Sequence, residues 1–443
     1  MEFHMVKEVK FADLTNFYRK VLEHLPDKRT GNNKSYSIMD AALGAFSVFF
    51  MQSPSFLAHQ REMEAGSQCN NACSLFKIDK IPSDNHIRDL LDEVSPAAIF
   101  PVFDCIFNAF QKTKHLEKFR FFKNQLLLLL DGTEYFSSNN IHCDKCSTKA
   151  HKNGDITYSH SAITPVIAHP NYRRVISLPP EFITPQDGHE KQDCENAAAK
   201  RWLCGTGAKY AELGVTILGD DLYSRQPICE TTLKQGFNFI FVCKPDSHKS
   251  LYKDYIDSGI KIESLEVKRR NSKGKKDTML YRFINNIPLR DGDDALKVNW
   301  CEVAIINDAG KATYRNSFIT NHVVTEENIA DMVLAGRTRW KVENENNNTL
   351  KTKGYHLEHN FGHGKKHLSS LLMTLNLLAF LFHTVLEFTD KKYRILREDM
   401  PRRVTFFDHI RSLTCYLFFK SWDDLIDFMI EKRKLTSLVH NTS

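Results

Sequence analysis

The chain has 443 residues, of which 42% are hydrophobic and 26% are charged. This composition is typical of a globular protein and excludes a largely disordered chain, and the length allows two or three domains. The net charge of +6 is only mildly basic, so binding to a polyanion would depend on local basic clusters. The 11 cysteines are an odd number in a chain with no recognisable signal peptide, which favours a reducing compartment. We therefore expect a cytoplasmic protein.

Helical periodicity dominates roughly the first 120 residues. Residues 36–51 are apolar on nearly all sides, which predicts a buried helix. Ser83, Asp84 and Asn85 precede a short amphipathic stretch and form a helix-start signal. We therefore predict a helical domain over residues 1–122.

The first acid of interest follows an uninterrupted leucine run. Residues 126–130 are all leucine and lead directly into Asp131, which predicts a buried central strand that delivers a carboxylate to a sheet edge. Residues 161–169 and 174–183 are predicted as the next two strands. The alanine-rich middle of residues 190–213 predicts a helix.

A second strand that ends in acids is predicted over residues 215–219. Asp220 and Asp221 follow it, and strand alternation allows only one of these neighbours to face a site. A short helix over residues 227–235 and a strand over residues 238–244 come next. The predicted order is thus three strands, helix, strand, helix and strand.

A β-rich insertion is predicted before the last acidic segment. Residues 252–324 contain alternating apolar and polar patterns, which are typical of strands. The following helix is expected to begin near Thr325, a candidate N-cap with an acidic first turn.

Polar side chains repeat every four residues along this helix and therefore share one face. They are Arg339, Glu343, Asn347 and Lys351. Taken alone, the pattern is that of a solvated helix with ion pairs. Together with Asp131 and Asp220, however, Glu343 completes a set of three acids on three elements. That set favours metal-dependent phosphoryl transfer, because Mg²⁺ prefers hard oxygen ligands.

These segments together resemble insertion-sequence DDE transposases, in the branch whose third acid lies in a Tyr-Arg-Glu-Lys signature helix. The stretch from Arg339 to Glu343 has the Arg-to-Glu spacing of that signature, whereas the tyrosine position holds Gly336 and Lys351 lies one residue beyond the usual lysine. The family's aromatic residue three positions after the second acid matches Tyr223 and so favours Asp220. The resemblance covers most of residues 30–385 and includes PSFLAHQREME, IPSDNHIRDLLDEV, PEFITPQDGHEKQDCENAAAKRW and LKTKGYHLEHNFGHGKKH.

The resemblance implies an α/β fold in which helices flank an RNase-H-like mixed sheet. The β-rich insertion would precede the last catalytic helix. The implied domains are a helical, DNA-end-binding domain over 1–122, a catalytic domain over 123–390 with its insertion at 252–324, and a C-terminal helical segment over 391–443.

The resemblance also implies a function and its residues. Asp131, Asp220 and Glu343 would hold two Mg²⁺, for which Mn²⁺ can substitute. The residues expected to contact DNA are Arg339, Trp340, Lys341 and Lys351; for Trp340, packing on the sheet is the favoured alternative to base stacking. Double-stranded DNA, at the element ends and at the target, would be the partner of a homodimer or larger assembly. A nuclease without strand transfer and a catalytically inactive, domesticated DNA-binding protein remain alternatives.

Cysteines and histidines form a second cluster. Cys143 and Cys146, with His142 and His151, have the spacing of a structural Zn²⁺ site, and His160 is a further candidate ligand. A hairpin tip with two free thiols fits the same spacing equally well. Four later histidines are expected to contact phosphate or pack at a helix end rather than bind metal; they are His356, His359, His363 and His367.

The longest apolar segment, residues 368–388, contains several polar side chains. It is therefore predicted to be a buried helix, and no membrane contact is expected.

Overall fold

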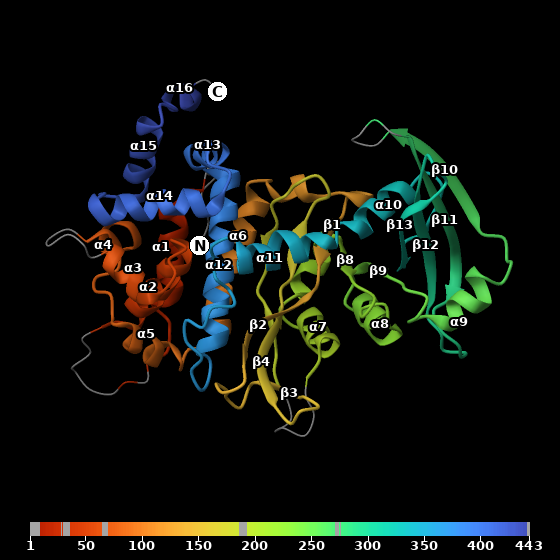
Figure 1. Cartoon of the computed structure of the whole chain (residues 1–443), viewed down its shortest axis with the longest axis horizontal. Helices are drawn as coiled ribbons and strands as arrows, with labels where there is room; N and C mark the ends of the chain where they lie inside the picture. The colour runs from red at the N-terminus through yellow and green to blue at the C-terminus, as the bar shows by residue number, and fades with distance from the viewer. Residues whose placement is uncertain are drawn as a thin grey trace.

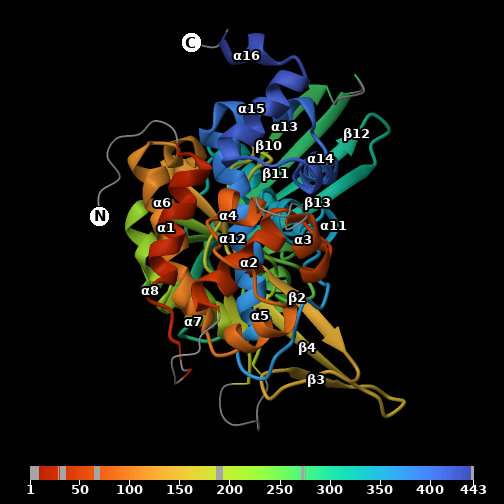
Figure 2. The same cartoon turned by 90° about the vertical axis from the view of Figure 1, so that its left-hand side faces the viewer.

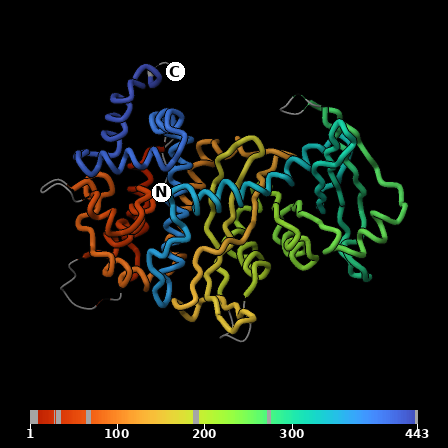
Figure 3. Tube along the Cα trace, viewed as in Figure 1, coloured from red at the N-terminus to blue at the C-terminus, as the bar shows by residue number. Residues whose placement is uncertain are grey.

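A computed structural model describes residues 9–27, 29, 36–63, 70–185, 193–270, 274 and 276–440 (Figure 1). Helices from both ends of the chain gather on one side of the molecule, and two sheets with further helices occupy the rest (Figures 1 and 3). The N-terminal helices are α1 (Phe11–Leu22), α2 (Ile38–Phe50), α3 (Phe56–Met63), α4 (Asn71–Phe76), α5 (Asp84–Leu91) and α6 (Phe100–Lys112), with 3-10 turns at Pro96–Ile99, Leu116–Phe119 and Phe122–Asn124. The C-terminal helices are α12 (Leu368–Thr389), α13 (Lys391–Asp399), α14 (Arg403–Tyr416), α15 (Trp422–Lys432) and α16 (Thr436–His440).

Two apolar helices form the centre of the helical part. In α2, every residue except Met39 is buried, which confirms the predicted buried helix. In the described part of the chain, α12 alone has the length and composition to cross a membrane, but 94% of its apolar window is buried inside the protein. α12 packs against α2 on one side and against strand β6 of the sheet on the other, as expected of a core helix (Figure 2).

The main sheet is mixed and has nine strands in the order β10-β11-β12-β13-β9-β8-β1-β5-β6. Their bounds are β1 (Leu126–Leu129), β5 (Val166–Ala168), β6 (Ile176–Ser177), β8 (Val215–Gly219), β9 (Asn238–Val242), β10 (Glu263–Arg270), β11 (Lys276–Pro288), β12 (Lys297–Asn307) and β13 (Ala312–Thr320). β1 runs parallel to β8 and antiparallel to β5, and β8 runs parallel to β9. The leucines of β1 are fully buried, as their uninterrupted run predicts. The expectation of a mixed sheet flanked by helices is thus confirmed.

Prolines divide two of the predicted strands. The strand expected over residues 161–169 is interrupted at Pro165, and the strand expected over residues 174–183 at Pro179 and Pro180. Proline has no N–H to donate to a sheet ladder, so it ends a strand or bends it. The pieces between these breaks, residues 166–168 and 176–177, join the main sheet, whereas the piece before Pro165 and the piece after Pro180 join a second, smaller sheet. Its strands are β2 (Gly132–Ser138), β3 (Ser147–Ala150), β4 (Ile156–Ile163) and β7 (Glu181–Ile183).

The helix predicted over residues 190–213 is shorter than expected. α7 spans Glu195–Cys204, and a 3-10 turn follows at Ala208–Leu213; the predicted start at Glu190 lies outside the described residues. The break falls at Gly205 and Gly207. A side chain at Gly207 would collide with Trp202, only 2.4 Å from where its Cβ would be. The next helix, α8 (Gln226–Lys234), matches its prediction closely.

The β-rich character predicted for residues 252–324 is confirmed, with one unforeseen feature. After short helical turns at Lys249–Leu251 and Tyr252–Ile256, strands β10 to β13 form an antiparallel meander. This meander extends the main sheet, because β13 pairs with β9. The helix that follows is α10 (Ile329–Arg337), and it begins after Asn328 rather than at Thr325. A local hydrogen bond accompanies this later start of the helix: the Thr325 N–H donates to the Asn328 side chain at 3.1 Å.

Beyond α10 the helical path is irregular. A π-helical turn, Val342–Asn347, leads into the short helix α11 (Asn348–Thr352). π-turns use i→i+5 hydrogen bonds and often occur at functional sites. The predicted catalytic helix is therefore three pieces rather than one.

Candidate active site

Two of the three predicted acids lie beside each other because of strand register. Leu129 of β1 pairs with Leu218 of β8 in a parallel ladder, and Asp131 and Asp220 each lie two residues further along. The carboxyl ends of parallel neighbouring strands meet at the same sheet edge, about 4.8 Å apart in the hydrogen-bonding direction. The two predicted acids thus project from adjacent positions.

The hydrogen-bond partners of Asp220 and Asp221 indicate which of the two acids belongs to the candidate site. Asp220 accepts a hydrogen bond from the Leu222 N–H at 2.8 Å, and its charge acts on Asp131. Asp221 points the other way, where it accepts from the Lys244 N–H at 2.7 Å and from the Ser247 hydroxyl. Asp221 therefore stabilises a turn, and Asp220 faces the first acid.

Glu343 reaches the same region from the π-helical turn. It is exposed, and its charge raises the pKa of Asp131. Two further residues of this segment contact Asp131 directly. The Asn347 amide donates to one carboxylate oxygen at 3.3 Å, and Arg339 lies 3.9 Å from the other.

A fourth acid, Glu195, was missed in the sequence. It is the first residue of α7, and its carboxylate accepts hydrogen bonds from the Gly132 N–H at 3.1 Å and the Tyr223 hydroxyl at 2.8 Å. Gly132 permits this approach, because a Cβ there would lie 2.5 Å from a Glu195 oxygen. An acid in the first turn of a helix is a common complement to the helix dipole, so its sequence position carried no distinctive signal.

Burial and neighbouring charges raise the pKa of two acids of this group, Asp131 and Glu195. Burial is the main cause that raises the pKa of Asp131 to about 7; Glu195, Asp220 and Glu343 raise it further, and Arg339 opposes them. Burial also raises the pKa of Glu195, with a contribution from Asp220. Closely placed carboxylates in a desolvated site cannot all ionise easily, and such perturbed groups are typical of functional sites.

The residues predicted to contact DNA differ in their exposure and in their partners. Trp340 is 45% exposed, so the expectation that it packs on the sheet is wrong. Lys341 is only 3% exposed, and its ammonium donates to the Tyr172 carbonyl; this placement contradicts a role in contacting DNA. Lys351 pairs with Glu358 at 2.9 Å.

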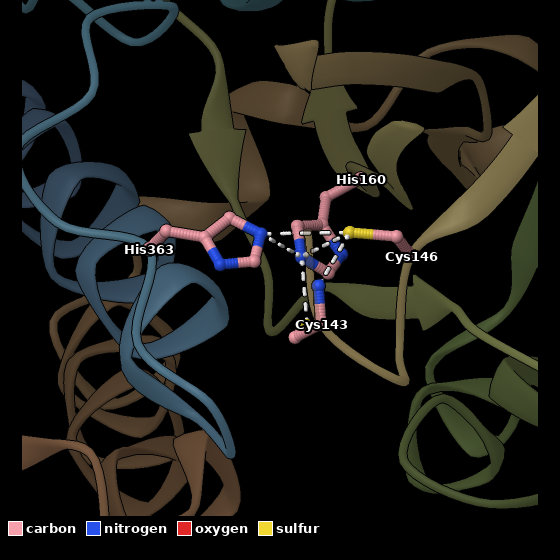
Figure 4. A group of neighbouring side chains, drawn as sticks. All are labelled: Cys143, Cys146, His160 and His363. Atoms are coloured by element: carbon pink, nitrogen blue, oxygen red, sulfur yellow. Dashed lines mark hydrogen bonds between the residues drawn. The ribbon is translucent and has the colours of Figure 1, made fainter. Parts of the chain in front are cut away.

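A second cluster forms where the smaller sheet meets the loop before α12. Cys143 and Cys146 lie between β2 and β3, His160 lies in β4, and His363 lies between α11 and α12. Among the described residues, this group brings one ligand atom from each member within 4.8 Å of the others; the acid cluster does not reach that spacing. Figure 4 shows the four side chains converging from three segments.

Two of the histidines expected in this cluster lie elsewhere. His142 stacks on Tyr158, with ring centroids 4.3 Å apart, and His151 lies 2.8 Å from the Thr157 hydroxyl. Both are exposed. The proposed ligand set with His142 and His151 is therefore wrong, and His160 and His363 take their places.

No protein-family model matches the chain, and no curated protein matches it either. Function must therefore be inferred from the geometry of the two clusters.

Proposed function

We propose that the protein is a DDE transposase with an RNase-H-like core, which cleaves and joins DNA strands at the ends of a mobile element. The observation that carries this proposal is the gathering of Asp131, Asp220 and Glu343, with Glu195, at one edge of the main sheet. The segments that carry Asp131, Asp220 and Glu343 are also those on which the sequence resembles DDE transposases.

The strand order supports the RNase-H-like part of the proposal. Along β6-β5-β1-β8-β9, β5 runs antiparallel to both of its neighbours, and β1, β8 and β9 run parallel to one another. Helix α7 precedes β8, and α8 connects β8 to β9. This is the order expected of that fold, with the β10 to β13 meander inserted before the third acid.

The donor set suits Mg²⁺. The four acids that meet at the sheet edge offer carboxylate oxygens, the hard ligands that Mg²⁺ prefers, and their mutual repulsion would be relieved by bound cations. Asp131, Asp220 and Glu343 would hold two Mg²⁺, which supply an activated oxygen nucleophile and a stabilised leaving oxygen.

Neighbouring side chains orient these acids. Asn347 holds one oxygen of Asp131, and the Thr164 hydroxyl in turn donates to Asn347 at 2.7 Å. Tyr223 fixes Glu195 beside them. Side chains that fix metal-binding carboxylates in this way typically affect activity by about 10–100-fold.

A basic cleft of about 990 Å³ lies beside the same π-turn. Its lining holds six cations, Arg173, Arg174, Lys353, Arg397, Arg402 and Arg403, and three acids, Glu345, Glu387 and Glu398. Arg174, Arg397 and Arg403 pair with Glu387, which leaves the exposed Arg173, Lys353 and Arg402 for phosphate. Phosphate contacts from such residues give affinity and register without reading the base sequence. We assign the DNA backbone to this cleft, in place of the contact predicted for the buried Lys341.

The test uses the purified full-length chain and duplex DNA that carries the sequences flanking its own gene. With Mg²⁺ or Mn²⁺, we expect cleavage at one fixed position beside an inverted repeat, followed by joining of the released end to a target plasmid. Holding two ends for this reaction implies a dimer or larger assembly on DNA. Cleavage without joining would favour the nuclease alternative, and binding without cleavage would favour an inactive DNA-binding protein.

A further inference from the structure

We propose that Cys143, Cys146, His160 and His363 form a structural Zn²⁺ site that joins the smaller sheet to the loop between α11 and α12 (Figure 4). This inference does not depend on the proposed catalysis, because the two clusters share no residue.

Four of the six distances between ligand atoms match a tetrahedral ion, and the other two lie within 4.8 Å. Zn–S bonds of about 2.3 Å and Zn–N bonds of about 2.05 Å require S–N separations of about 3.6 Å and an N–N separation of about 3.3 Å. The Nε2 atom of His160 lies 3.6 Å from the sulfur of Cys143 and 3.4 Å from that of Cys146. The Nε2 atom of His363 lies 3.5 Å from Cys146 and 3.1 Å from Nε2 of His160.

Hydrogen bonds prepare the ligands for a metal ion. The Nδ1–H of His363 donates to the Gly364 carbonyl at 2.9 Å, which leaves its Nε2 lone pair directed at the thiols. Metal-binding histidines are usually oriented by a bond of this kind. The backbone N–H of Cys143 donates to the sulfur of Cys146 at 3.4 Å, which helps to hold this sulfur within the cluster.

The surroundings suit a closed structural site. Cys146 and His160 are each 5% exposed, and His363 is 9% exposed. Tyr135 stacks on His160, and Phe136 packs against His363 at 4.5 Å between ring centroids. Cys143 is half-buried and, with His160 and His363, lines a pocket of about 380 Å³. Four protein ligands would nevertheless complete a tetrahedral shell, which is the form of a structural rather than a catalytic zinc site.

The site would connect distant segments near the candidate active site. His363 lies 217 residues beyond Cys146 in the chain. The strand β2 that leads to the cysteines begins directly after Asp131, and the loop that carries His363 follows the segment with Glu343. A bound zinc ion would therefore fix the segment after the first acid to the segment after the third.

Metal analysis of the purified full-length chain tests the proposal. We expect about one zinc per chain, as four-coordinate closure requires, and a Co²⁺-substituted form with the visible absorption of tetrahedral thiolate coordination. Cys146→Ser and His363→Ala should each lose most of the zinc. The matched controls are His142→Ala and His151→Ala, which should keep it because neither ring faces the cluster.

Hydrogen–deuterium exchange before and after chelation of zinc tests, in the wild-type chain, whether the ion holds the two segments together. Exchange should rise in both residues 139–151 and residues 353–367 and fall again when zinc is restored. Folded wild-type protein that takes up no zinc, a Cys143–Cys146 disulfide in freshly reduced protein, or zinc loss in His142→Ala but not in His363→Ala would overturn the proposal. Zinc binding without DNA cleavage would leave it standing and count only against the transposase assignment.

Discussion

At the residue scale, neighbouring side chains with the same chemistry have different roles. Asp220 and Asp221 are adjacent acids after one strand, yet one faces Asp131 and the other holds the turn at Lys244 and Ser247. Arg339 and Lys341 are close cations, yet one lies beside Asp131 and the other is buried. Exposure and partners, rather than residue type, separate these roles.

The first prediction concerns the two aspartates. Asp220→Asn should lower Mg²⁺-dependent cleavage by more than about 100-fold, because loss of a metal ligand should exceed the 10–100-fold cost of losing an outer-shell partner. Asp221→Asn should mainly lower the free energy of unfolding, by about 1–2 kcal/mol, because it weakens hydrogen bonds to a charged acceptor. Cleavage assays and urea denaturation of both variants check this; the reverse assignment would follow if Asp221→Asn were the inactive one.

Cations of the basic cleft and the buried lysine should differ in DNA binding. Arg173→Ala should reduce the slope of log affinity against log salt concentration by about 1, as expected for one lost phosphate contact. Lys341→Met should leave that slope unchanged, since its ammonium bonds to the Tyr172 carbonyl inside the protein. Fluorescence anisotropy over a range of salt concentrations measures both slopes. An equal loss of slope in the two variants would contradict the placement of DNA in the cleft.

At the element scale, α12 depends on side chains at both of its ends. Its N-terminus is capped from another helix, because Asp92 accepts hydrogen bonds from the N–H groups of residues 365–368 at 2.9–3.0 Å. These bonds lower the pKa of Asp92 although burial opposes them. Gly364 makes room for this carboxylate and has a φ of +68°, which favours glycine.

Removing this cap should destabilise the protein. Asp92→Ala is expected to lower the free energy of unfolding by about 1–3 kcal/mol, because it leaves the N–H groups of residues 365–368 without their charged acceptor. Asp89→Ala, at an exposed carboxylate one turn earlier in α5, should change it by less than about 0.5 kcal/mol. Urea denaturation of both variants decides the matter, and equal effects would argue against the cap.

Near the other end of α12, Glu387 is 5% exposed and pairs with Arg174 at 2.6 Å, Arg403 at 3.0 Å and Arg397 at 3.3 Å. Burial alone would raise its pKa, but Arg403, Arg174 and Arg397 together hold the pKa of Glu387 below its usual value. A lowered folded-state pKa contributes stability that is present above the unfolded value of about 4.3 and is lost as the pH falls through the folded value.

Glu387→Gln should therefore cost about 3–5 kcal/mol at pH 7, because it leaves buried arginines without their counter-charge. The difference from wild type should shrink as the pH falls below about 4.3, since protonated glutamate resembles glutamine. Denaturation curves at a series of pH values measure this difference. A difference that stays constant with pH would show that the carboxylate charge is not the cause.

At the scale of the whole molecule, local sequence patterns predicted the individual strands better than they predicted which segments pack or pair with each other. The leucine run gave β1, the β-branched run gave β8, and the alternating stretch gave the insertion. Pairing of β13 with β9 was not predicted, because it joins segments about 80 residues apart that carry no mutual signal in one sequence. Helices from both chain ends also meet; for example, the Thr389 hydroxyl donates to the Val9 carbonyl at 2.7 Å.

In the candidate sites too, residues marked by a local pattern were predicted, and residues brought in from distant segments were not. Asp131 and Asp220 were predictable because each ends a buried strand. His363 was not, because spacing near Cys143 and Cys146 pointed to closer histidines. Glu195 was missed because its surroundings exist only after α7 packs beside Gly132 and Tyr223.

The most direct test of the central claim is DNA cleavage by Asp131→Asn. This change removes one negative charge from the acid cluster and leaves the basic cleft untouched, so Mg²⁺-dependent cleavage should fall by more than about 100-fold while DNA affinity in the same preparation stays within about threefold. Asp331→Asn, at an exposed acid of α10, is the matched control and should cleave like wild type. Cleavage retained by Asp131→Asn at the wild-type rate would contradict the claim.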